Sequence, residues 1–466
     1  MTGTVSTELR IWVQLDIMWD TETGILPERG MTAMAQARMR VSSVGCFVAD
    51  SDTHEQNEEM ATLIRRLKAL TTKSPNDVVI LSAVRSPITR AFKGGFKDAW
   101  PEDILAPVMA EAARRAKIQS GDVQDVLIGN VLAELGFAKT GRMALLHAGF
   151  PTSTTFHTVN RQCSSSLQAL SHMAHAIQAG QIDVALAGGV ESMSKNYQSR
   201  GIPQDVGPTL RNTKVKAASD CLMPMGITSE NVARRYGVDR KMQDEYALLS
   251  HTRANEALAA GRFEAEIVQI EYTVYDNETG NTSQVRVAAD DTIRPNVTLE
   301  KLAKLKPAFL EDGGSTAGNS SQISDGASAA ILARRSWATE RGLKPVARFL
   351  GTQVAGCEPD EMGMGPIYAI PRLYQHVGIE QKDVDVIELN EAFASQTLAC
   401  INKLGLDVDK VNPNGGAIAI GHPTGATGTR QLATLIAELG RRGKEIGIIS
   451  MCASTGIGVA SAIIVE

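Results

Sequence analysis

The sequence predicts an α/β fold made of two copies of one unit, with a further region inserted into the first copy. Short apolar runs of strand length alternate with longer segments in which apolar residues recur every three or four positions, as in amphipathic helices. In addition, an apolar strand with a charged lead-in and a terminal asparagine occurs twice, as DVQDVLIGN ending at Asn130 and KDVDVIELN ending at Asn390. A repeat of this kind indicates a duplicated structure.

The predicted elements begin at residue 77. The run DVVILSAV predicts a buried strand, and EDILAPVMAEAARRAKI predicts a helix. The first repeat continues with a helix in SSSLQALSHMAHAIQAG and a strand in DVALAGG, and the second with a helix in TRQLATLIAELGRRG and a strand in IGIISMC. Because strands alternate with helices, we expect a parallel sheet covered on both faces.

Two segments do not follow this alternation. Residues 1–73 lack sustained periodicity, and we expect a poorly ordered or accessory N-terminal extension. Residues 200–300 are richer in polar and charged side chains and are interpreted as an inserted loop domain with helices and a hairpin. The predicted division is therefore an extension (1–73), an N-terminal half (74–199 and 301–335), the inserted loop domain (200–300) and a C-terminal half (336–466).

Composition excludes several classes of protein. The chain has 466 residues, 43% of them hydrophobic and 21% charged, with a net charge of −5, which is an ordinary globular balance without a basic field for nucleic acid. No apolar run approaches the ~18–20 residues that span a bilayer. The six cysteines form no CxxC pair, so neither a disulfide framework nor a metal site is predicted.

Cys163 lies at a predicted helix start, in VNRQCSSSLQAL. A free thiol has a pKa near 8.5, so only a small fraction is thiolate at neutral pH. A helix N-terminus favours the anion by roughly 0.3–1 kcal/mol, or ~2 kcal/mol when partly buried. The helix start would thus supply part of the activation, and an imidazole within hydrogen-bond reach would complete it. The alternative is a buried structural cysteine.

His422 occupies the corresponding place in the second repeat. It follows Asn390 by 32 residues, and Cys163 follows Asn130 by 33. Packing of two related halves would bring His422 and Cys163 face to face. Cys452 ends a predicted strand before a glycine-rich turn, where a thiol is placed to act as an acid or base, and the Asn390 amide can hold a water or a carbonyl oxygen.

Seven motifs together resemble the thiolase family, in order and spacing, over about residues 74–465. They are NRQCSSSL, CLMPMGITSENVA, KLKPAF, TAGNSSQISDGA, LNEAFASQ, NPNGGAIAIGHPTGATG and MCASTGIG. They are most similar to the peroxisomal type of 3-ketoacyl-CoA thiolase. The resemblance implies a five-layered αβαβα fold with an inserted loop domain, acyl-CoA and CoA as substrates, no metal or redox cofactor, and a homodimer or homotetramer.

The resemblance also assigns roles to residues. Cys163 matches the nucleophile that accepts the acyl group, and His422 matches the base that activates it. Cys452 matches the cysteine that moves the proton on the substrate's α-carbon, and Asn390 the residue that holds a water for one oxyanion hole. The second hole would use backbone N–H groups at Cys163 and around Ser454.

Other residues are expected to bind substrate. By resemblance, the substrate and CoA contacts are Ser321, Met225, Ala317, Gly318 and Ser454. A set of basic residues in the inserted region is a candidate contact for CoA phosphates or an ordinary solvated surface, namely Arg211, Lys214, Lys216, Arg234 and Arg235.

The implied reaction is cleavage of 3-ketoacyl-CoA by CoA to acetyl-CoA and a shortened acyl-CoA, as in fatty acid β-oxidation. A biosynthetic acetoacetyl-CoA thiolase and a specialised or inactive CoA-binding paralogue are alternatives. Decarboxylating ketoacyl synthases share the fold, but by resemblance they would carry histidine in place of Asn390 or Cys452. A nicotinamide dehydrogenase is disfavoured because no predicted strand leads into GxGxxG.

Three departures from the family pattern stand out. Ser166 replaces a glycine, and we expect its side chain to fill space beside the thioester. Ser454 replaces another glycine, where a left-handed φ would cost about 1–2 kcal/mol. Thr424 and Ala426 stand where peroxisomal members usually have leucine and cysteine.

The compartment is inferred from the resemblance alone. Neither end of the sequence shows a recognisable peroxisomal targeting pattern, since the C-terminal residues are IIVE. We expect a peroxisomal protein, with mitochondrial and cytoplasmic locations as alternatives.

Overall fold

The computed structural model describes residues 72–203, 205–276 and 278–466. The expected N-terminal extension therefore lies outside the described residues, apart from its last two positions. Thr72–Glu466 form one compact unit. The domain limits given above stay a prediction.

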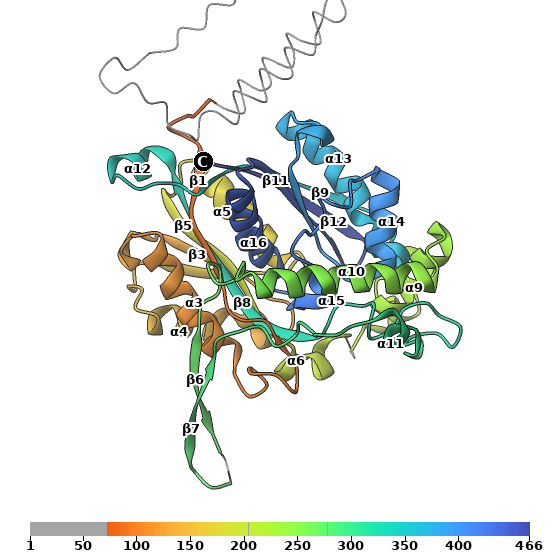
Figure 1. The fold of residues 1–466 in the computed structure, drawn as a ribbon. Helices are drawn as coiled ribbons and strands as arrows, with labels where there is room; N and C mark the ends of the chain where they lie inside the picture. Colours follow the sequence, from red (N-terminus) through yellow and green to blue (C-terminus); the bar gives the residue numbers. More distant parts are fainter. Residues whose placement is uncertain (1–71, 204, 277) are drawn as a thin grey trace, which may run out of the picture. The chain divides into compact units, whose positions relative to one another are not determined.

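Two sets of strands form the centre of this unit, and they share one order except that β4 extends the first set (Figure 1). The first is ordered β1-β8-β5-β3-β4, with bounds β1 (Val78–Arg85), β3 (Asp125–Gly129), β4 (Thr155–Val159), β5 (Val184–Ser192) and β8 (Ser324–Arg334). The second is ordered β9-β12-β11-β10, with bounds β9 (Ala347–Gly356), β10 (Val386–Leu389), β11 (Ile446–Ala453) and β12 (Ile457–Val465). A two-residue strand, β2 (Thr89–Arg90), pairs with β8. The matching orders show that both repeats fold in the same way.

The two sets join along a short edge. Val79 and Ile80 of β1 pair with Arg348 and Ala347 of β9. The sheets are mixed, so the expected parallel sheet is wrong in part. β3 is parallel to β4 and β5, and β10 to β11, but β1, β8, β9 and β12 pair antiparallel. The physical reason is that β11 returns into β12 through a tight turn, and β8 follows the inserted region, so neither needs a crossover helix.

Helices cover and separate the two sheets, giving the five layers implied by the resemblance (Figure 1). The outer helices on the first sheet are α3 (Pro101–Arg115) and α4 (Ala138–His147), and those beside the second are α13 (Gly365–Val377) and α14 (Ala394–Leu404). The central layer contains α5 (Ser165–Gln178) and α16 (Thr427–Arg442), which lie side by side. Shorter elements are α6 (Met193–Arg200), α12 (Arg335–Glu340), α15 (Ala417–Ile420), η2 (Ser120–Asp122), η3 (Glu134–Phe137), η4 (Pro359–Met364) and η5 (Gln381–Asp383).

The central helices are held by a shared apolar core. Leu432, Leu435 and Leu439 recur along one face of α16 and are fully buried. They belong to the same cluster as Leu167 and Leu170 of α5 and the inward residues of both sheets. Each buried leucine contributes roughly 1.5–3 kcal/mol relative to an exposed one. This burial fixes the starts of α5 and α16, where the site lies.

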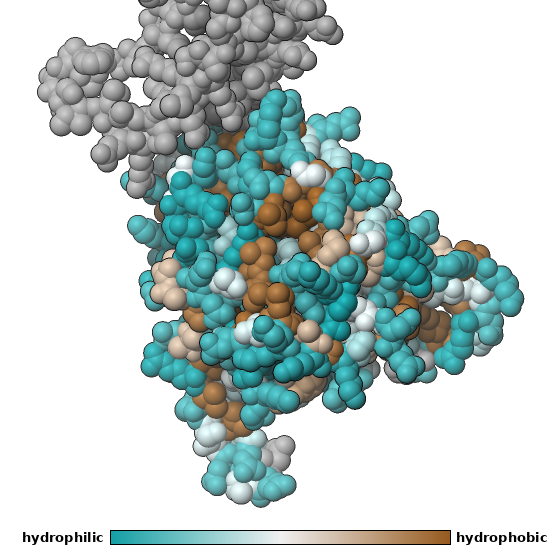
Figure 2. Space-filling model, turned by 45° about the vertical axis from the view of Figure 1, so that its right-hand side comes forward, coloured by the Kyte–Doolittle hydropathy of each residue, from teal (hydrophilic) through white to brown (hydrophobic). Residues whose placement is uncertain are grey.

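The inserted region consists of helices and one hairpin. Its helices are α7 (Pro208–Arg211), α8 (Lys216–Asp220), α9 (Met225–Tyr236), α10 (Arg240–Ala259) and α11 (Leu299–Ala303). The hairpin, β6 (Ile270–Tyr275) and β7 (Thr282–Val287), projects from the body in Figure 1. The face in Figure 2 is mainly hydrophilic, with separate apolar patches. Among the described helices, none is long and apolar enough to cross a membrane.

Candidate active site

The starts of the two central helices meet. The Thr429 amide in the first turn of α16 donates to Ser166 Oγ in the first turn of α5, at 3.1 Å. A Cβ at Gly428 would lie 2.6 Å from Leu167 Cβ, so only glycine allows this approach. Cys163 precedes α5 and His422 precedes α16. The packing therefore brings together the helix starts that follow the two candidate residues, and the face-to-face placement of their side chains stays a prediction.

The Cys163 thiol is buried, with only 5% of the residue exposed. Burial, with a smaller contribution from the nearby Glu191 charge, raises its pKa to about 11. The backbone amides of Ser454 and of Cys163 itself hydrogen-bond to the sulfur and lower the pKa, but by less than burial raises it. The helix start was expected to lower the pKa of Cys163 and so favour the thiolate. The net shift is upward instead, so this expectation is wrong. The resting group is a thiol.

His422 is neutral, and its tautomer follows from its neighbours. Burial, with a smaller contribution from the Arg430 charge, lowers the pKa of its imidazole to about 3. The Thr427 hydroxyl donates to the Pro423 carbonyl at 3.0 Å, so it accepts the Nδ1–H of His422, which lies 2.6 Å away. The proton is thereby assigned to Nδ1. The lone pair of Nε2 faces Asn390 Nδ2 at 3.4 Å and is available as a base.

Asn390 closes β10 and is fully buried. Its backbone amide donates to the Ser450 carbonyl at 2.9 Å, and its carbonyl accepts from Gln396 Nε2 at 3.2 Å. Its side-chain Oδ1 has no hydrogen-bond partner in the described structure. A buried, firmly anchored amide with one open polar atom is suited to hold a water or a substrate oxygen.

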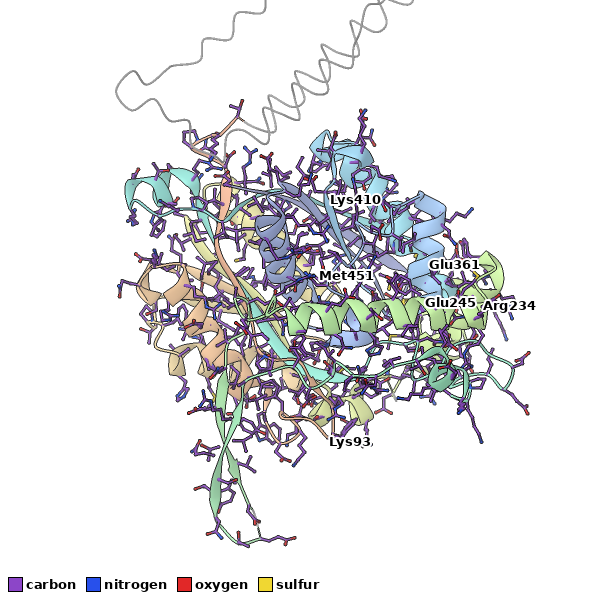
Figure 3. The ribbon with its side chains drawn as sticks, viewed as in Figure 1. Lys93, Arg234, Glu245, Glu361, Lys410 and Met451 are labelled. Atoms are coloured by element: carbon purple, nitrogen blue, oxygen red, sulfur yellow. The ribbon has the colours of Figure 1, made fainter. Side chains whose placement is uncertain are left out.

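Cys452 lies near the end of β11 in an apolar environment. It clusters with Met362, Ala392 and Phe393, and Met225 packs against the cluster. Its neighbour Met451, labelled in Figure 3, is likewise fully buried. Burial, followed by the nearby Cys163, raises the pKa of Cys452 well above its usual range. The group is therefore a thiol that can donate a proton.

The TAGNSS turn lies beside the Asn390 loop. The Ser321 amide donates to the Ala392 carbonyl at 3.0 Å. Gly318 is buried where a Cβ would lie 2.5 Å from Leu305 Cδ1, while Ala317 is exposed. In the described part of the chain, no hydrogen bond joins Ala317 or Gly318 to the four candidate catalytic residues. Their predicted role as CoA contacts stays a prediction.

Two of the basic residues in the inserted region are already paired. Arg235 Nη2 lies 2.6 Å from Asp360 Oδ2, and Lys216 Nζ lies 2.9 Å from the same oxygen. Arg235 also pairs with Glu361. Figure 3 labels Glu361 and Arg234, the neighbour of Arg235 in the sequence, at the right of the view. Arg235 and Lys216 therefore hold the inserted region to η4, which weakens their case as phosphate contacts.

Comparison with known proteins settles the family. Residues 78–336 match the thiolase N-terminal domain, and residues 343–466 match the thiolase C-terminal domain. The chain belongs to the thiolase family. It is 48% identical over 400 residues to the peroxisomal 3-ketoacyl-CoA thiolase of Yarrowia lipolytica, which covers 86% of this chain and 96% of that protein. It is 48% identical over 389 residues to the human peroxisomal 3-ketoacyl-CoA thiolase, covering 83% and 91%.

Solved structures give the same result. The crystal structure of the dimeric peroxisomal thiolase of Saccharomyces cerevisiae matches with a TM-score of 0.77 and 43% identity, covering 86% of this chain and all of that one. Human mitochondrial 3-ketoacyl-CoA thiolase in complex with CoA matches with a TM-score of 0.74 and 35% identity, covering 84% and 98%. The resemblance and the fold inferred from the sequence motifs are confirmed.

The structure corrects one expectation about where this thiolase departs from the family pattern and adds a contact at another. The Ser166 hydroxyl accepts the Thr429 amide between the two helices, and its expected place beside the thioester stays a prediction. Ser454 does not have a left-handed backbone. The positive φ angles fall on the next two residues, Thr455 at 70° and Gly456 at 84°. The Ser454 amide is therefore free of this strain and donates to the Cys163 sulfur.

Several contributors to the site were missed by the sequence reasoning. Ser324 Oγ accepts the His422 amide at 2.8 Å, and Thr427 fixes the tautomer. Glu391 accepts from Tyr246 and Ser250 of α10, so it ties the inserted region to the Asn390 loop. All three residues lie within the recognised motifs, which gave a signal but no role. Ser324 reaches the His422 segment from β8, a contact that its own motif does not indicate.

Proposed function

We propose that this protein is a 3-ketoacyl-CoA thiolase, an acetyl-CoA C-acyltransferase. It cleaves 3-ketoacyl-CoA with CoA to acetyl-CoA and a shortened acyl-CoA, as in fatty acid β-oxidation, through an acyl-enzyme on Cys163. One observation carries the proposal beyond family membership. The buried Cys163 thiol accepts a hydrogen bond from the Ser454 amide. In the same region, the neutral His422 imidazole carries its proton on Nδ1 and keeps the lone pair of Nε2.

The first step is attack on the ketone. With a thiol whose pKa is about 11 and an imidazole whose pKa is about 3, a standing ion pair is disfavoured. Nε2 of His422 therefore takes the proton as Cys163 Sγ bonds to the 3-keto carbon. The amides of Cys163 and Ser454 hold the oxyanion, each such donor being worth ~10²–10³-fold in rate.

The second step breaks the bond between Cα and Cβ. The electron pair passes to the acetyl-CoA enolate, whose oxygen is held on the Asn390 side through a water. Cys452 gives its proton to the carbon, and acetyl-CoA leaves. The Cys452 thiolate then takes the proton of an incoming CoA thiol, and the CoA thiolate attacks the acyl group. Cys163 leaves as thiolate and recovers the proton from His422, so the starting state is restored.

Coenzyme A is a substrate in this scheme, and three side chains, those of Cys163, His422 and Cys452, carry every proton. The apolar cluster around Cys452, with Met225 and an edge-on Phe309–Phe393 pair at 6.0 Å between ring centroids, is suited to receive an acyl chain. No cofactor takes part in any of these steps.

We also infer a peroxisomal homodimer, because the Yarrowia lipolytica and human relatives at 48% identity are peroxisomal and the yeast peroxisomal enzyme is dimeric. Size-exclusion chromatography with light scattering should give twice the chain mass of 49.9 kDa. A mass of one chain, or of four, would contradict the inferred dimer.

Thiolysis assays test the function. Acetoacetyl-CoA and 3-ketohexadecanoyl-CoA are each mixed with CoA, and loss of the enolate absorbance is followed, with Cys163→Ala as the control. Turnover of the long substrate that the control abolishes would support the degradative enzyme. Turnover of acetoacetyl-CoA alone would favour the biosynthetic alternative. No turnover of either, with CoA still bound, would leave an inactive paralogue.

A further inference from the structure

The two halves place different groups at one equivalent position. Gly129 of β3 pairs with Gly189 of β5, and Leu389 of β10 pairs with Ser450 of β11. One residue past β3 and β10 come Asn130 and Asn390. Two residues past the paired positions on β5 and β11 come Glu191 and Cys452. The N-terminal half therefore carries a carboxylate where the C-terminal half carries its acid–base thiol.

Glu191 is fully buried and accepts five hydrogen bonds. Its Oε2 accepts from the Val131 amide at 3.0 Å, Thr424 Oγ1 at 2.9 Å and the Gly425 amide at 3.1 Å. Its Oε1 accepts from the Leu132 amide at 3.2 Å and Asn130 Nδ2 at 3.4 Å. Burial raises the pKa of Glu191 to about 7, but these neighbours are donors, so the geometry favours the carboxylate.

The donors come from both halves of the molecule. Val131 and Leu132 follow β3, whereas Thr424 and Gly425 follow His422 and lead into α16. Glu191 thus holds the segment that carries the imidazole against the loop after β3. Thr424 is one of the departures from the family pattern, where leucine is usual, and here it adds a side-chain donor. The carboxylate also lies near enough to raise the pKa of Cys163.

We propose that Glu191 is a positioning residue for the thiolase reaction, holding the His422 segment in place through hydrogen bonds from both halves. The inference rests on the proposed function. Glu191 does not contact the reacting atoms. It acts through His422, and its charged form is the one that can accept all five donors.

The test compares purified full-length wild-type protein with Glu191→Gln in steady-state thiolysis between pH 5.5 and 9. Glutamine presents an NH₂ group to N–H and O–H donors, so kcat should fall about 10–100-fold while KM changes by less than about threefold. The wild-type kcat should decrease as pH falls through about 7, where the carboxylate takes up a proton. This inflection should be absent from Glu191→Gln.

Other titratable groups around Glu191 must be separated from it. They are Cys163 before α5, His422 before α16 and Asp325 on β8, whose pKa burial raises to about 6. An inflection that belongs to Asp325 would persist in Glu191→Gln. Thr424→Val removes one donor, so it should move the inflection to higher pH and lower kcat less than Glu191→Gln does. This milder variant decides the question if Glu191→Gln does not fold.

Asp77→Asn is the matched control. Asp77 accepts from the Ser74 amide, Arg335 and Arg348, so it also joins the two halves, but it precedes β1 at the end of the sheet away from Glu191. The Asp77→Asn variant should have a lower free energy of unfolding, with kcat and the pH inflection unchanged. An unchanged kcat and inflection in Glu191→Gln, or an unmoved inflection in Thr424→Val, would overturn the inference. Absence of turnover in the wild type would instead refute the proposed function.

Discussion

At the scale of single residues, burial dominates the electrostatics of the site. It raises the pKa of Cys163 to about 11 and lowers that of His422 to about 3. Both shifts favour the uncharged pair, so in the proposed mechanism proton transfer accompanies attack rather than preceding it. The hydrogen bond to Thr427 then matters, because it determines which imidazole nitrogen can act as the base.

Replacing Thr427 tests this tautomer. In Thr427→Val the Nδ1–H loses its acceptor, which costs about 1–3 kcal/mol for a buried donor. We expect kcat for thiolysis to fall about 10–100-fold with little change in KM. Thr427→Ser keeps the hydroxyl and should stay within a few-fold of wild type. Equal losses in both variants would show that packing, not the hydroxyl, is responsible.

The pKa of Cys163 can be measured from its reactivity. Because the thiolate is the reacting form and the pKa is about 11, alkylation by iodoacetamide should accelerate about tenfold per pH unit from pH 7 to 9.5, without a plateau. Peptide mass spectrometry assigns the modified cysteine. A plateau below pH 9 at Cys163 would mean that a thiolate already exists at neutral pH.

At the scale of elements, a residue of one half caps a helix of the other. Ala426 precedes α16, and its side chain makes no capping hydrogen bond. Instead, Ser166 Oγ accepts the Thr429 amide in the first turn of α16. The serine that departs from the family pattern is therefore a cap supplied by α5. It joins the two halves directly beside the nucleophile.

Ser166→Ala should lower the free energy of unfolding by about 0.5–2 kcal/mol, since it leaves that amide without its acceptor. Urea denaturation measures the loss. Ser166→Gly, the residue expected from the family pattern, should cost somewhat more because glycine destabilises a helix interior. A Ser166→Ala protein as stable as wild type would show that the cap contributes nothing.

Elements near the repeat were predictable, and their contacts were not. The strands ending at Asn130 and Asn390 and the two central helices follow from apolar periodicity and from repetition. The antiparallel pairing of β8 and β12 did not, because periodicity carries no strand direction. The hydrogen bonds from Thr424 to Glu191 and from Thr429 to Ser166 also escaped prediction, since each joins residues more than 200 positions apart in sequence.

At the scale of the whole molecule, a buried ion network attaches the inserted region to the first sheet. Arg85, at the end of β1, is fully buried. Its Nε lies 2.6 Å from Glu266, and its two other nitrogens lie 2.7 and 2.9 Å from the Asp290 carboxylate. Both acids lie in the sequence between α10 and β8. The geometry is bidentate, which lysine cannot reproduce.

Arg85→Met should lower the free energy of unfolding by about 3–5 kcal/mol, because it leaves two buried carboxylates without their cation. Arg85→Lys should lose less. Arg114→Met serves as the control, because Arg114 pairs with Glu111 on the exposed surface and should show no measurable change in urea denaturation. A similar loss in the Arg114 and Arg85 variants would contradict the assigned role of the network.

The most direct measurement of the central claim is the mass of the acylated protein. The full chain is mixed with 3-ketohexadecanoyl-CoA without free CoA, quenched in acid and analysed intact and after digestion. We predict a mass increase equal to one tetradecanoyl group, removed by hydroxylamine, on the peptide that contains Cys163 and absent from Cys163→Ala. Release of acetyl-CoA without this adduct, or an adduct on Cys452, would contradict the account.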